Sequence, residues 1–355
     1  MENRCFIILM LLLKFYACSA QQSEILYPAK EWDHISDKEM KEWNASKLSK
    51  LRKYIIASSN TTGMLVIYNG KILFEYGNIS DNSYIASCRK SILSMLYGAF
   101  VEKKKILLDK TLKELGMDDI GGLLPIEKMA TIRDLLTARS GVYHPASNPG
   151  DATAMAPARG SVEPGSFFLY NNWDFNVAGY ILEKETGLNI YDITDSILTK
   201  PLMFQDWNRS IQHKTGDSTL SKYMAYHLWF STRDMARIGY LMLRKGQWRE
   251  KTILSSDWVK LITTPVTSYE ETVSNHTNYF DFSYGYLWWI WDNHVKNKFY
   301  KGGYTASGAF GQFITVLPAL DLVIAHKTNY DDYGRNTPTE TYLRIVEKLF
   351  RAKTN

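Results

Sequence analysis

Two residues whose types could do chemistry, Ser87 and Lys90, stand three positions apart at the predicted start of an apolar helix. Residues at i and i+3 lie on one helix face, so the lysine amine can reach the serine hydroxyl. A serine needs an adjacent base to act as a nucleophile, and a lysine can be that base if burial lowers its pKa. The helix start adds N–H groups where negative charge would develop. The spacing therefore indicates acyl transfer, with a capping serine and a solvated lysine as the alternative.

A second pair of candidate residues, Tyr170 and Asn172, lies just before another predicted helix. A tyrosine beside a serine–lysine pair can shuttle a proton, provided that a nearby cation favours its phenolate. Asn172 could offer its amide to the substrate or to Lys90. The alternative is a core tyrosine followed by an asparagine that caps the helix, which we predict to end at Thr186.

The elements that must position these residues follow from hydrophobic periodicity. Asn69-Gly70 between alternating apolar runs predicts a hairpin of residues 64–68 and 72–76. The Ser87 helix should extend to about residue 103, and residues 105–215 are helical and loop-rich. Four strands are predicted later in the chain, followed by an amphipathic helix at residues 340–350; the strands are 286–291, 298–301, 311–317 and 322–326.

This order of elements predicts an α+β fold. Strands near both ends of the chain, with helices between them, indicate an antiparallel sheet flanked by helices and completed by both terminal regions, with an inserted mainly helical lobe. We expect the sheet lobe to comprise residues 21–104 and 216–355, and the helical lobe to comprise residues 105–215.

Composition and the first residues bear on where the protein acts. The chain has 355 residues, of which 45% are hydrophobic, and its net charge of +5 includes no basic run typical of nucleic-acid binding. Residues 1–20 resemble a secretory signal, with Arg4, an apolar run over 5–13 and small residues at 18–20. We expect an exported protein, periplasmic or secreted, that meets a membrane only if Cys18 carries a lipid anchor.

Several motifs in order resemble the serine β-lactamase and penicillin-binding protein superfamily, most closely its class C and esterase-type branch. The resemblance spans roughly residues 63–325. It implies a β-lactamase/transpeptidase-like fold, with Ser87, Lys90 and Tyr170 as catalytic residues and no metal or organic cofactor. The motifs are Ala-Ser-Cys-Arg-Lys-Ser at 86–91, residues 131–137 with Ser140-Gly141, Pro-Gly-Ser-Phe at 164–167 before 170–172, residues 231–239, and residues 308–312 with 316–318.

The third motif of that superfamily is a strand that binds the substrate and completes the oxyanion hole. A literal Lys-Thr-Gly occurs at 214–216 but lies in a polar run, so we favour Ala-Ser-Gly at 306–308. The resemblance then implies substrate binding by Ser307, Gly308 and Ala309, with Asn172, and an oxyanion hole formed by the Ser87 and Ala309 N–H groups. Ser307 brings no positive charge for a carboxylate, although Lys301 is close in sequence.

Competing classes of function are less well supported. No Gly-x-Ser-x-Gly elbow or His-Glu-x-x-His motif occurs, which argues against other serine hydrolases and zinc hydrolases. We therefore expect an exported serine hydrolase acting on an ester or amide, including a D-amino-acid peptide or a lactam. The alternative is an inactive protein of the same fold that binds peptidoglycan-like or acyl ligands. Cys88 is expected to be buried, and Arg89 to face outward or pair with an acid.

Overall fold

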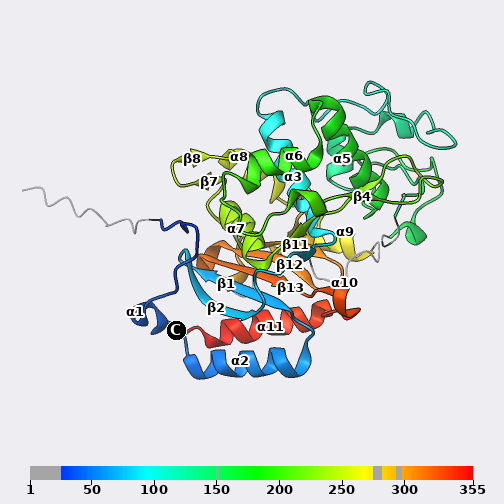
Figure 1. The fold of residues 1–355 in the computed structure, drawn as a ribbon. Coiled ribbons are helices and arrows are strands. Elements are labelled where there is room, and N and C mark those ends of the chain that lie inside the picture. The colour runs from blue at the N-terminus through cyan, green and yellow to red at the C-terminus, as the bar shows by residue number, and fades with distance from the viewer. Residues whose placement is uncertain (1–24, 149, 151, 275–281, 293–297, 355) are drawn as a thin grey trace, which may run out of the picture.

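Seven strands form one antiparallel sheet at the centre of the protein (Figure 1). The computed structural model describes residues 25–148, 150, 152–274, 282–292 and 298–354, so the predicted signal and Cys18 lie outside the described residues. Hairpin strands from the first quarter of the chain pair with strands from the last quarter, as predicted. The order across the sheet is β2 (Lys71–Gly77), β1 (Gly63–Tyr68), β13 (Leu322–Lys327), β12 (Gln312–Leu317), β11 (Tyr304–Gly308), β10 (Trp289–Ile290) and β9 (Ser283–Tyr284).

The predicted hairpin is confirmed in β1 and β2. Asn69 and Gly70 have φ angles of 49° and 79°, the left-handed conformation that a two-residue type I′ turn requires. A side chain at Gly70 would place its Cβ 2.5 Å from the Leu26 carbonyl oxygen. The turn therefore requires glycine here both for its φ angle and because there is no space for a side chain. All six residues of β1 are buried, because the strand pairs on both sides and helices cover both faces of the sheet.

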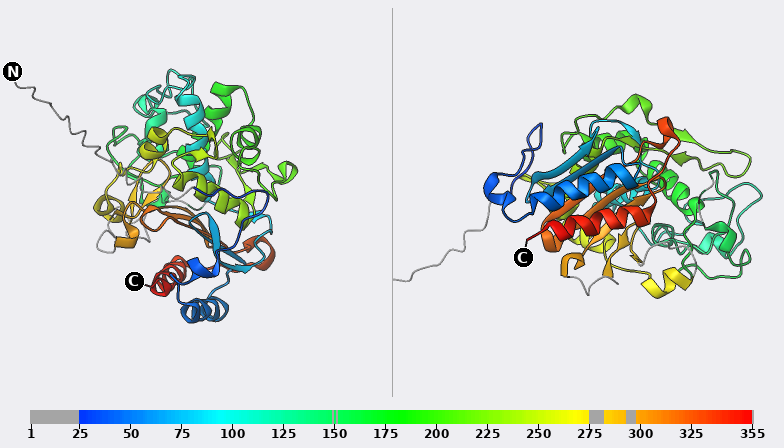
Figure 2. Two further views of the ribbon diagram at one scale, coloured as in Figure 1. Left: turned by 90° about the vertical axis from the view of Figure 1, so that its left-hand side faces the viewer. Right: turned by 90° about the horizontal axis from the view of Figure 1, so that it is seen from below.

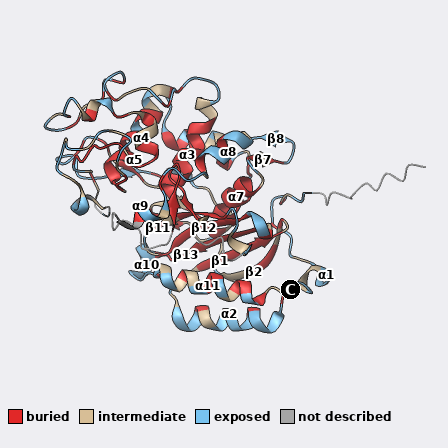
Figure 3. Cartoon of the chain, turned by 180° about the vertical axis from the view of Figure 1, so that it is seen from behind, coloured by how far each residue is buried: buried red, intermediate tan, exposed pale blue. Residues whose placement is uncertain are grey.

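Helices cover the two faces of the sheet. The pair α2 (Ala45–Ser58) and α11 (Thr339–Ala352) lies on one face, as Figure 2 shows from below. On the other face, α7 (Thr232–Leu243) packs so closely that a Cβ on Gly239 would lie 2.4 Å from Val323 Cγ1. Beyond α7 lies α3 (Cys88–Val101), whose first eleven residues are buried (Figure 3). The predicted Ser87 helix and the final amphipathic helix are thus both confirmed.

Among the described residues, the remaining elements include three small sheets and seven further α-helices, of which α5 (Asn172–Thr186) is the longest. Three two-stranded sheets pair β3 (Ser83–Tyr84) with β6 (Trp229–Phe230), β4 (Lys214–Thr215) with β5 (Ala225–Tyr226), and β7 (Gln247–Trp248) with β8 (Lys251–Thr252). In the part of the chain that the structure describes, no helix is both long and apolar enough to cross a membrane. The other helices are α1 (Asp37–Met40), α4 (Ile132–Leu136), α5 (Asn172–Thr186), α6 (Ile190–Thr194), α8 (Ser256–Ile262), α9 (Tyr269–Ser274) and α10 (Tyr330–Tyr333).

Two predicted strands were wrong in detail. Residues Lys298–Tyr300 form a 3₁₀ helix, η6, because the Tyr300 ring stacks on Trp291 at 4.8 Å and also packs against Phe350. The predicted strand at 286–291 is reduced to β10, because Leu287 has a φ of 64° that interrupts an extended backbone. The proposed lobe boundaries at residues 104/105 and 215/216 stay predictions.

A buried lysine, Lys327, ties the sheet to the segment that leads to Ser87. It ends β13, is 1% exposed, and its Nζ donates to the carbonyl oxygens of Asp81 at 3.2 Å, Ser83 at 3.1 Å and Phe230. These acceptors belong to or precede the β3–β6 pair, and β3 ends three residues before Ser87. The lysine therefore fixes the approach of the chain to the start of α3.

Burial lowers the pKa of Lys327 from 10.5 to about 7, although nearby carboxylates act in the opposite direction. Between pH 7 and 10.5 the unfolded chain then binds more protons at this residue than the folded chain does. The free energy of unfolding contributed by this group therefore rises with pH across that window and is lowest below it.

We predict that the Lys327→Met variant loses this pH dependence. The difference in free energy of unfolding between wild type and variant, measured by urea titration, should shift in favour of the wild type by on the order of 2 kcal/mol from pH 7 to pH 9.5. Other titrating groups cancel in the difference. A difference that stays constant with pH would contradict a lowered pKa at Lys327.

Candidate active site

The backbone at the start of α3 presents Ser87 in a strained turn. Ser87 is the N-cap residue of the helix, and its carbonyl accepts the Lys90 N–H at 3.0 Å. The residue before it, Ala86, has a φ of 47°, a left-handed conformation that a non-glycine residue rarely adopts. Such strain persists only where the surrounding structure imposes it, and it is concentrated at functional sites. Ser87 is partly exposed, whereas its neighbours Ala86 and Cys88 are buried.

The three predicted catalytic residues come together. Lys90 is 2% exposed, and its Nζ donates to the Tyr170 hydroxyl at 2.6 Å and to Asn172 Oδ1 at 2.7 Å. The Ser87 side chain is close enough to the Tyr170 hydroxyl to lower the pKa of that phenol, against the larger effect of burial. Ser87, Tyr170 and Lys90 thus lie together, although Tyr170 is 83 positions from Ser87 in the sequence.

Tyr170 is held as a neutral phenol. Burial raises the pKa of Tyr170 well above its ordinary value, and the nearby Ser87 side chain only partly offsets this. Its ring lies 4.9 Å from that of Phe175 and 5.6 Å from that of Trp289. The Lys90 nitrogen lies 4.1 Å from the centre of the Tyr170 ring. The phenolate that the sequence interpretation required is therefore not the resting form, and the hydroxyl is suited to pass a proton on rather than to hold a charge.

Asn172 contacts Lys90 and does not cap the helix. The N-cap of α5 is Asn171, whose side chain accepts the Asp174 N–H at 3.0 Å. This corrects the alternative in which Asn172 is the capping residue, because the helix begins one position earlier than that alternative requires. Asn172 is 2% exposed and its oxygen accepts from Lys90, so its amide orients the lysine. Its predicted contact with substrate stays a prediction.

The edge of β11 passes directly beside the start of α3. A Cβ added to Gly308 would lie 2.6 Å from the Ile85 carbonyl oxygen and 3.0 Å from the Ser87 nitrogen, so only glycine allows this approach. Within the described chain, neither Ser87 nor Ala309 uses its N–H in a backbone hydrogen bond. Two N–H groups on adjacent backbones suit a developing oxyanion, and this supports the predicted pair of donors.

The side chain of Ser307 points away from this contact. Ser307 pairs with Phe313, so both lie on the sheet face toward α11, where Phe313 stacks on Tyr342 at 3.9 Å. Alternation along the strand puts Ala306 and Gly308 on the face toward α3. β10 pairs with β11 at Tyr304 and Thr305, leaving the outer edge of residues 306–308 without a strand partner among the described residues. Backbone groups at this edge are therefore better placed to meet a substrate than the Ser307 hydroxyl.

Lys301 lies at the end of β11 that is far from Ser87. It is exposed and precedes β11, whereas Gly308 ends the strand beside Ser87. A strand rises about 3.3 Å per residue, so the length of β11 alone separates Lys301 from Gly308 by roughly 13 Å. Lys301 therefore does not supply the positive charge that Ser307 lacks.

The two residues between Ser87 and Lys90 are both buried. Cys88 Sγ donates to the Gln312 carbonyl oxygen at 3.3 Å, and burial raises the pKa of its thiol well above the ordinary value, so it is not a second nucleophile. Arg89 was expected to face outward or pair with an acid, and this is wrong. Its guanidinium donates to Asn176 Oδ1 at 3.0 Å and lies 4.3 Å from the centre of the Tyr226 ring.

The sequence did not predict the buried residues that surround the site without lining it. Arg89 contributes, after burial, to lowering the pKa of His227 to about 3, so His227 is neutral near the site at ordinary pH. Lys327 was missed for the same reason, because a buried cation leaves no spacing pattern. The rejection of Lys214-Thr215-Gly216 agrees with the structure, where Lys214 is exposed and pairs with Glu183.

Metal-binding clusters are absent from the part of the chain described. No group of three or more His, Cys, Asp or Glu side chains there is arranged to hold a metal ion. The groups that the structure gathers around Ser87 are its own hydroxyl, the Lys90 amine, the Tyr170 phenol and backbone N–H groups.

Comparison with known proteins places the fold in a family of hydrolases. A curated relative, the 6-aminohexanoate-dimer hydrolase of Paenarthrobacter ureafaciens, is 22% identical over 298 residues, covering 77% of this chain and 73% of the relative. Among solved structures, the octameric penicillin-binding protein homologue from Pyrococcus abyssi has a TM-score of 0.63 at 16% identity, covering 86% of this chain and 78% of the other. EstCE1, a hydrolase with promiscuous acyltransferase activity, has a TM-score of 0.62 at 14% identity, covering 86% and 98%.

The same arrangement of sheet and helices is therefore found in a penicillin-binding protein homologue and in a hydrolase with promiscuous acyltransferase activity. Residues 62–347 match the family described as Beta-lactamase, a range that contains Ser87, Lys90, Tyr170 and Gly308. The chain belongs to the Beta-lactamase family, within the serine β-lactamase and penicillin-binding protein superfamily.

Proposed function

We propose that this protein is a serine hydrolase that forms an acyl-enzyme on Ser87. The observation that carries the proposal is the buried Lys90, one turn along the helix from Ser87, whose amine contacts the Tyr170 hydroxyl and Asn172 Oδ1. Burying a lysine lowers the free energy of unfolding unless polar contacts compensate for the lost hydration. A lysine buried beside a partly exposed serine is therefore more readily explained by a function than by stability. Activation of Ser87 supplies that function.

In the acylation step, Ser87 Oγ attacks the carbonyl carbon of the substrate. Lys90 acts in this step as a neutral amine: the serine proton passes to the Tyr170 hydroxyl while the tyrosine proton passes to the lone pair of the Lys90 nitrogen, so the phenol relays a proton without remaining ionised. The carbonyl electrons move onto the oxygen, where the N–H groups of Ser87 and Ala309 stabilise the negative charge. Collapse of this intermediate breaks the bond to the leaving group, which departs with the proton returned through Tyr170.

In the deacylation step, water takes the place of the leaving group. It gives its proton to the same relay and attacks the acyl carbon, and Ser87 leaves as the hydroxyl when the proton comes back. No other reactant is needed. The relay therefore serves as base and as acid in each half of the reaction, which is the reason to treat Lys90 and Tyr170 as one unit.

The substrate we propose is an ester or an amide, with a D-amino-acid peptide or a lactam as narrower options. Two similar proteins support an acyl substrate, since one is named a 6-aminohexanoate-dimer hydrolase and EstCE1 is named a hydrolase with promiscuous acyltransferase activity. The outer edge of β11 suits an extended acyl chain, which could pair with the backbone of residues 306–308. We further propose export, on the strength of the signal-like residues 1–20, as a secreted or periplasmic protein or one anchored through Cys18.

The first test replaces the nucleophile. Ser87→Ala should abolish hydrolysis of short-chain p-nitrophenyl esters and labelling by a fluorophosphonate, while the melting temperature stays nearly unchanged, because Ser87 is partly exposed and its side chain caps no helix. Ser91→Ala, one turn further along α3, is the matched control and should keep its labelling. Full labelling of the Ser87→Ala protein would place the nucleophile elsewhere, and an unlabelled wild type would favour the inactive binding protein.

The second test concerns the relay. Lys90→Ala and Tyr170→Phe should each lower kcat by about 10²-fold or more, the usual scale for losing acid–base help. The double variant should lose far less than the product of the two effects, because neither group works without the other. Tyr143→Phe is the control, since that hydroxyl is buried without a hydrogen-bond partner in the described structure. Strictly multiplicative losses would show that Lys90 and Tyr170 do not share a step.

The third test concerns substrate charge. Ala306 and Ser307 are neutral and Lys301 is remote, so a substrate carboxylate would find no charge-assisted partner in this motif. Such a bond contributes roughly 1.5–3 kcal/mol against about 1 for a neutral donor, which corresponds to about tenfold in kcat/KM. A neutral ester should therefore be preferred over a chromogenic cephalosporin of similar size, and Lys301→Ala should leave the ratio unchanged. A preference for the cephalosporin that Lys301→Ala removes would contradict this account.

A further inference from the structure

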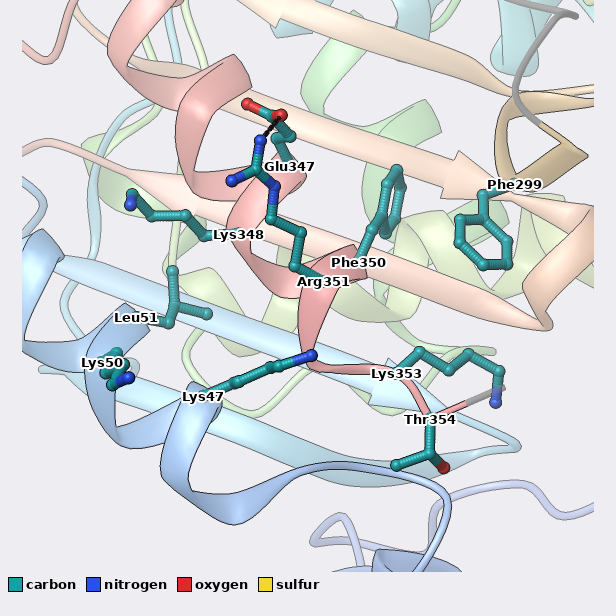
Figure 4. Close-up of a pocket in the computed structure, with 10 residues that line it drawn as sticks. All are labelled: Lys47, Lys50, Leu51, Phe299, Glu347, Lys348, Phe350, Arg351, Lys353 and Thr354. Carbon is teal, nitrogen blue, oxygen red and sulfur yellow. Dashed lines mark hydrogen bonds and ion pairs between the residues drawn. The ribbon is translucent and has the colours of Figure 1, made fainter.

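A basic pocket lies between α2 and α11, on the sheet face away from α3 and Ser87 (Figures 1 and 4). It encloses about 750 Å³. Its floor is apolar, formed by the buried Leu51 and Phe350 and by Phe299, whose ring lies 5.6 Å from that of Phe350. Its rim is cationic and includes Lys47 and Lys50 from α2. The pocket therefore combines an apolar base with a positively charged opening.

Basic residues are concentrated around this pocket. Helix α2 carries four basic and no acidic residues, and residues 339–353 carry four basic and two acidic ones, an excess larger than the net charge of +5 of the whole chain. Near the pocket, Arg351 pairs with Glu347 at 2.5 Å and Lys353 pairs with Glu42 at 3.0 Å. Lys47 and Lys50 make no ion pair with any carboxylate of the described residues.

We propose that this face binds the surface of a membrane rich in anionic phospholipid, with one lipid headgroup in the pocket. The phosphate would lie between Lys47 and Lys50 at the rim, and the first methylenes of its acyl chain would contact Phe299 and Phe350. A small inorganic anion would leave the apolar floor unused, whereas a lipid uses both parts. Helix α3, which begins next to Ser87, lies on the other face of the sheet from α2 and α11 (Figure 1). A protein bound in this way would therefore have Ser87 on the side that faces away from the membrane.

The experiment measures partition of the full chain onto phospholipid vesicles by sedimentation at fixed ionic strength. Vesicles with a third phosphatidylglycerol should bind the protein, and vesicles of phosphatidylcholine alone should bind it much less. Each basic residue near an anionic surface adds about fivefold to the partition coefficient, so Lys47→Gln combined with Lys50→Gln should weaken binding by about 30-fold. Glutamine keeps the helix propensity of α2. Every variant carries the same residues 1–24, so any contribution from them cancels.

The matched control neutralises two exposed lysines on the opposite side of the molecule, Lys251 in β8 and Lys260 in α8, which changes the net charge equally. Lys251→Gln combined with Lys260→Gln should bind vesicles as the wild type does. Equal losses in the two double variants would reduce the effect to net charge and overturn the assignment. Equal binding to both kinds of vesicle, or undiminished binding by the Lys47/Lys50 variant, would also overturn it. Ester hydrolysis by all variants should be unchanged, since none alters the Ser87 site.

Discussion

The constraint on which the site depends is the burial of the Lys90 amine between α3 and α5. One turn of α3 aligns Lys90 with Ser87, and the N-terminal turn of α5 brings the acceptor oxygen of Asn172. Removing a lysine amine from water costs several kcal/mol unless polar groups receive it, and here Tyr170 and Asn172 do so. The packing of the two helices is thus inseparable from the arrangement of the reactive groups, because each contact that holds the amine also aligns it with the serine.

The sheet contributes to the same site by a close approach of backbones. Gly308 lets β11 touch the start of α3, and Lys327 at the end of β13 holds the carbonyl groups of the β3–β6 segment that leads to Ser87. The strained φ of Ala86 lies between these two supports. Strain of this kind is maintained by a rigid surrounding, and two strands of one sheet, β11 and β13, provide it together with α3. The opposite sheet face, under α2 and α11, is free to carry an unrelated surface.

Local rules identified much of this architecture from the sequence. The Asn69-Gly70 turn, the Ser87–Lys90 spacing and the amphipathic final helix each depend on residues close together in the chain, and all three are found in the structure. Arg89 and the 3₁₀ helix at 298–300 were misjudged, because tertiary packing against Tyr226 and Trp291 decides them. The phenol of Tyr170 stays protonated for a similar reason, since burial is a property of the folded chain and not of the motif.

The measurement that tests the central claim most directly is the mass of the protein after an acid quench during turnover of a slowly hydrolysed p-nitrophenyl ester. An acyl-enzyme mechanism predicts an increase equal to the acyl group, and fragmentation of the peptide that contains residues 86–90 should place it on Ser87. The adduct should disappear on the time scale of turnover once the ester is consumed. Turnover with no covalent adduct at any quench time, or an adduct on Cys88 in place of Ser87, would contradict the account.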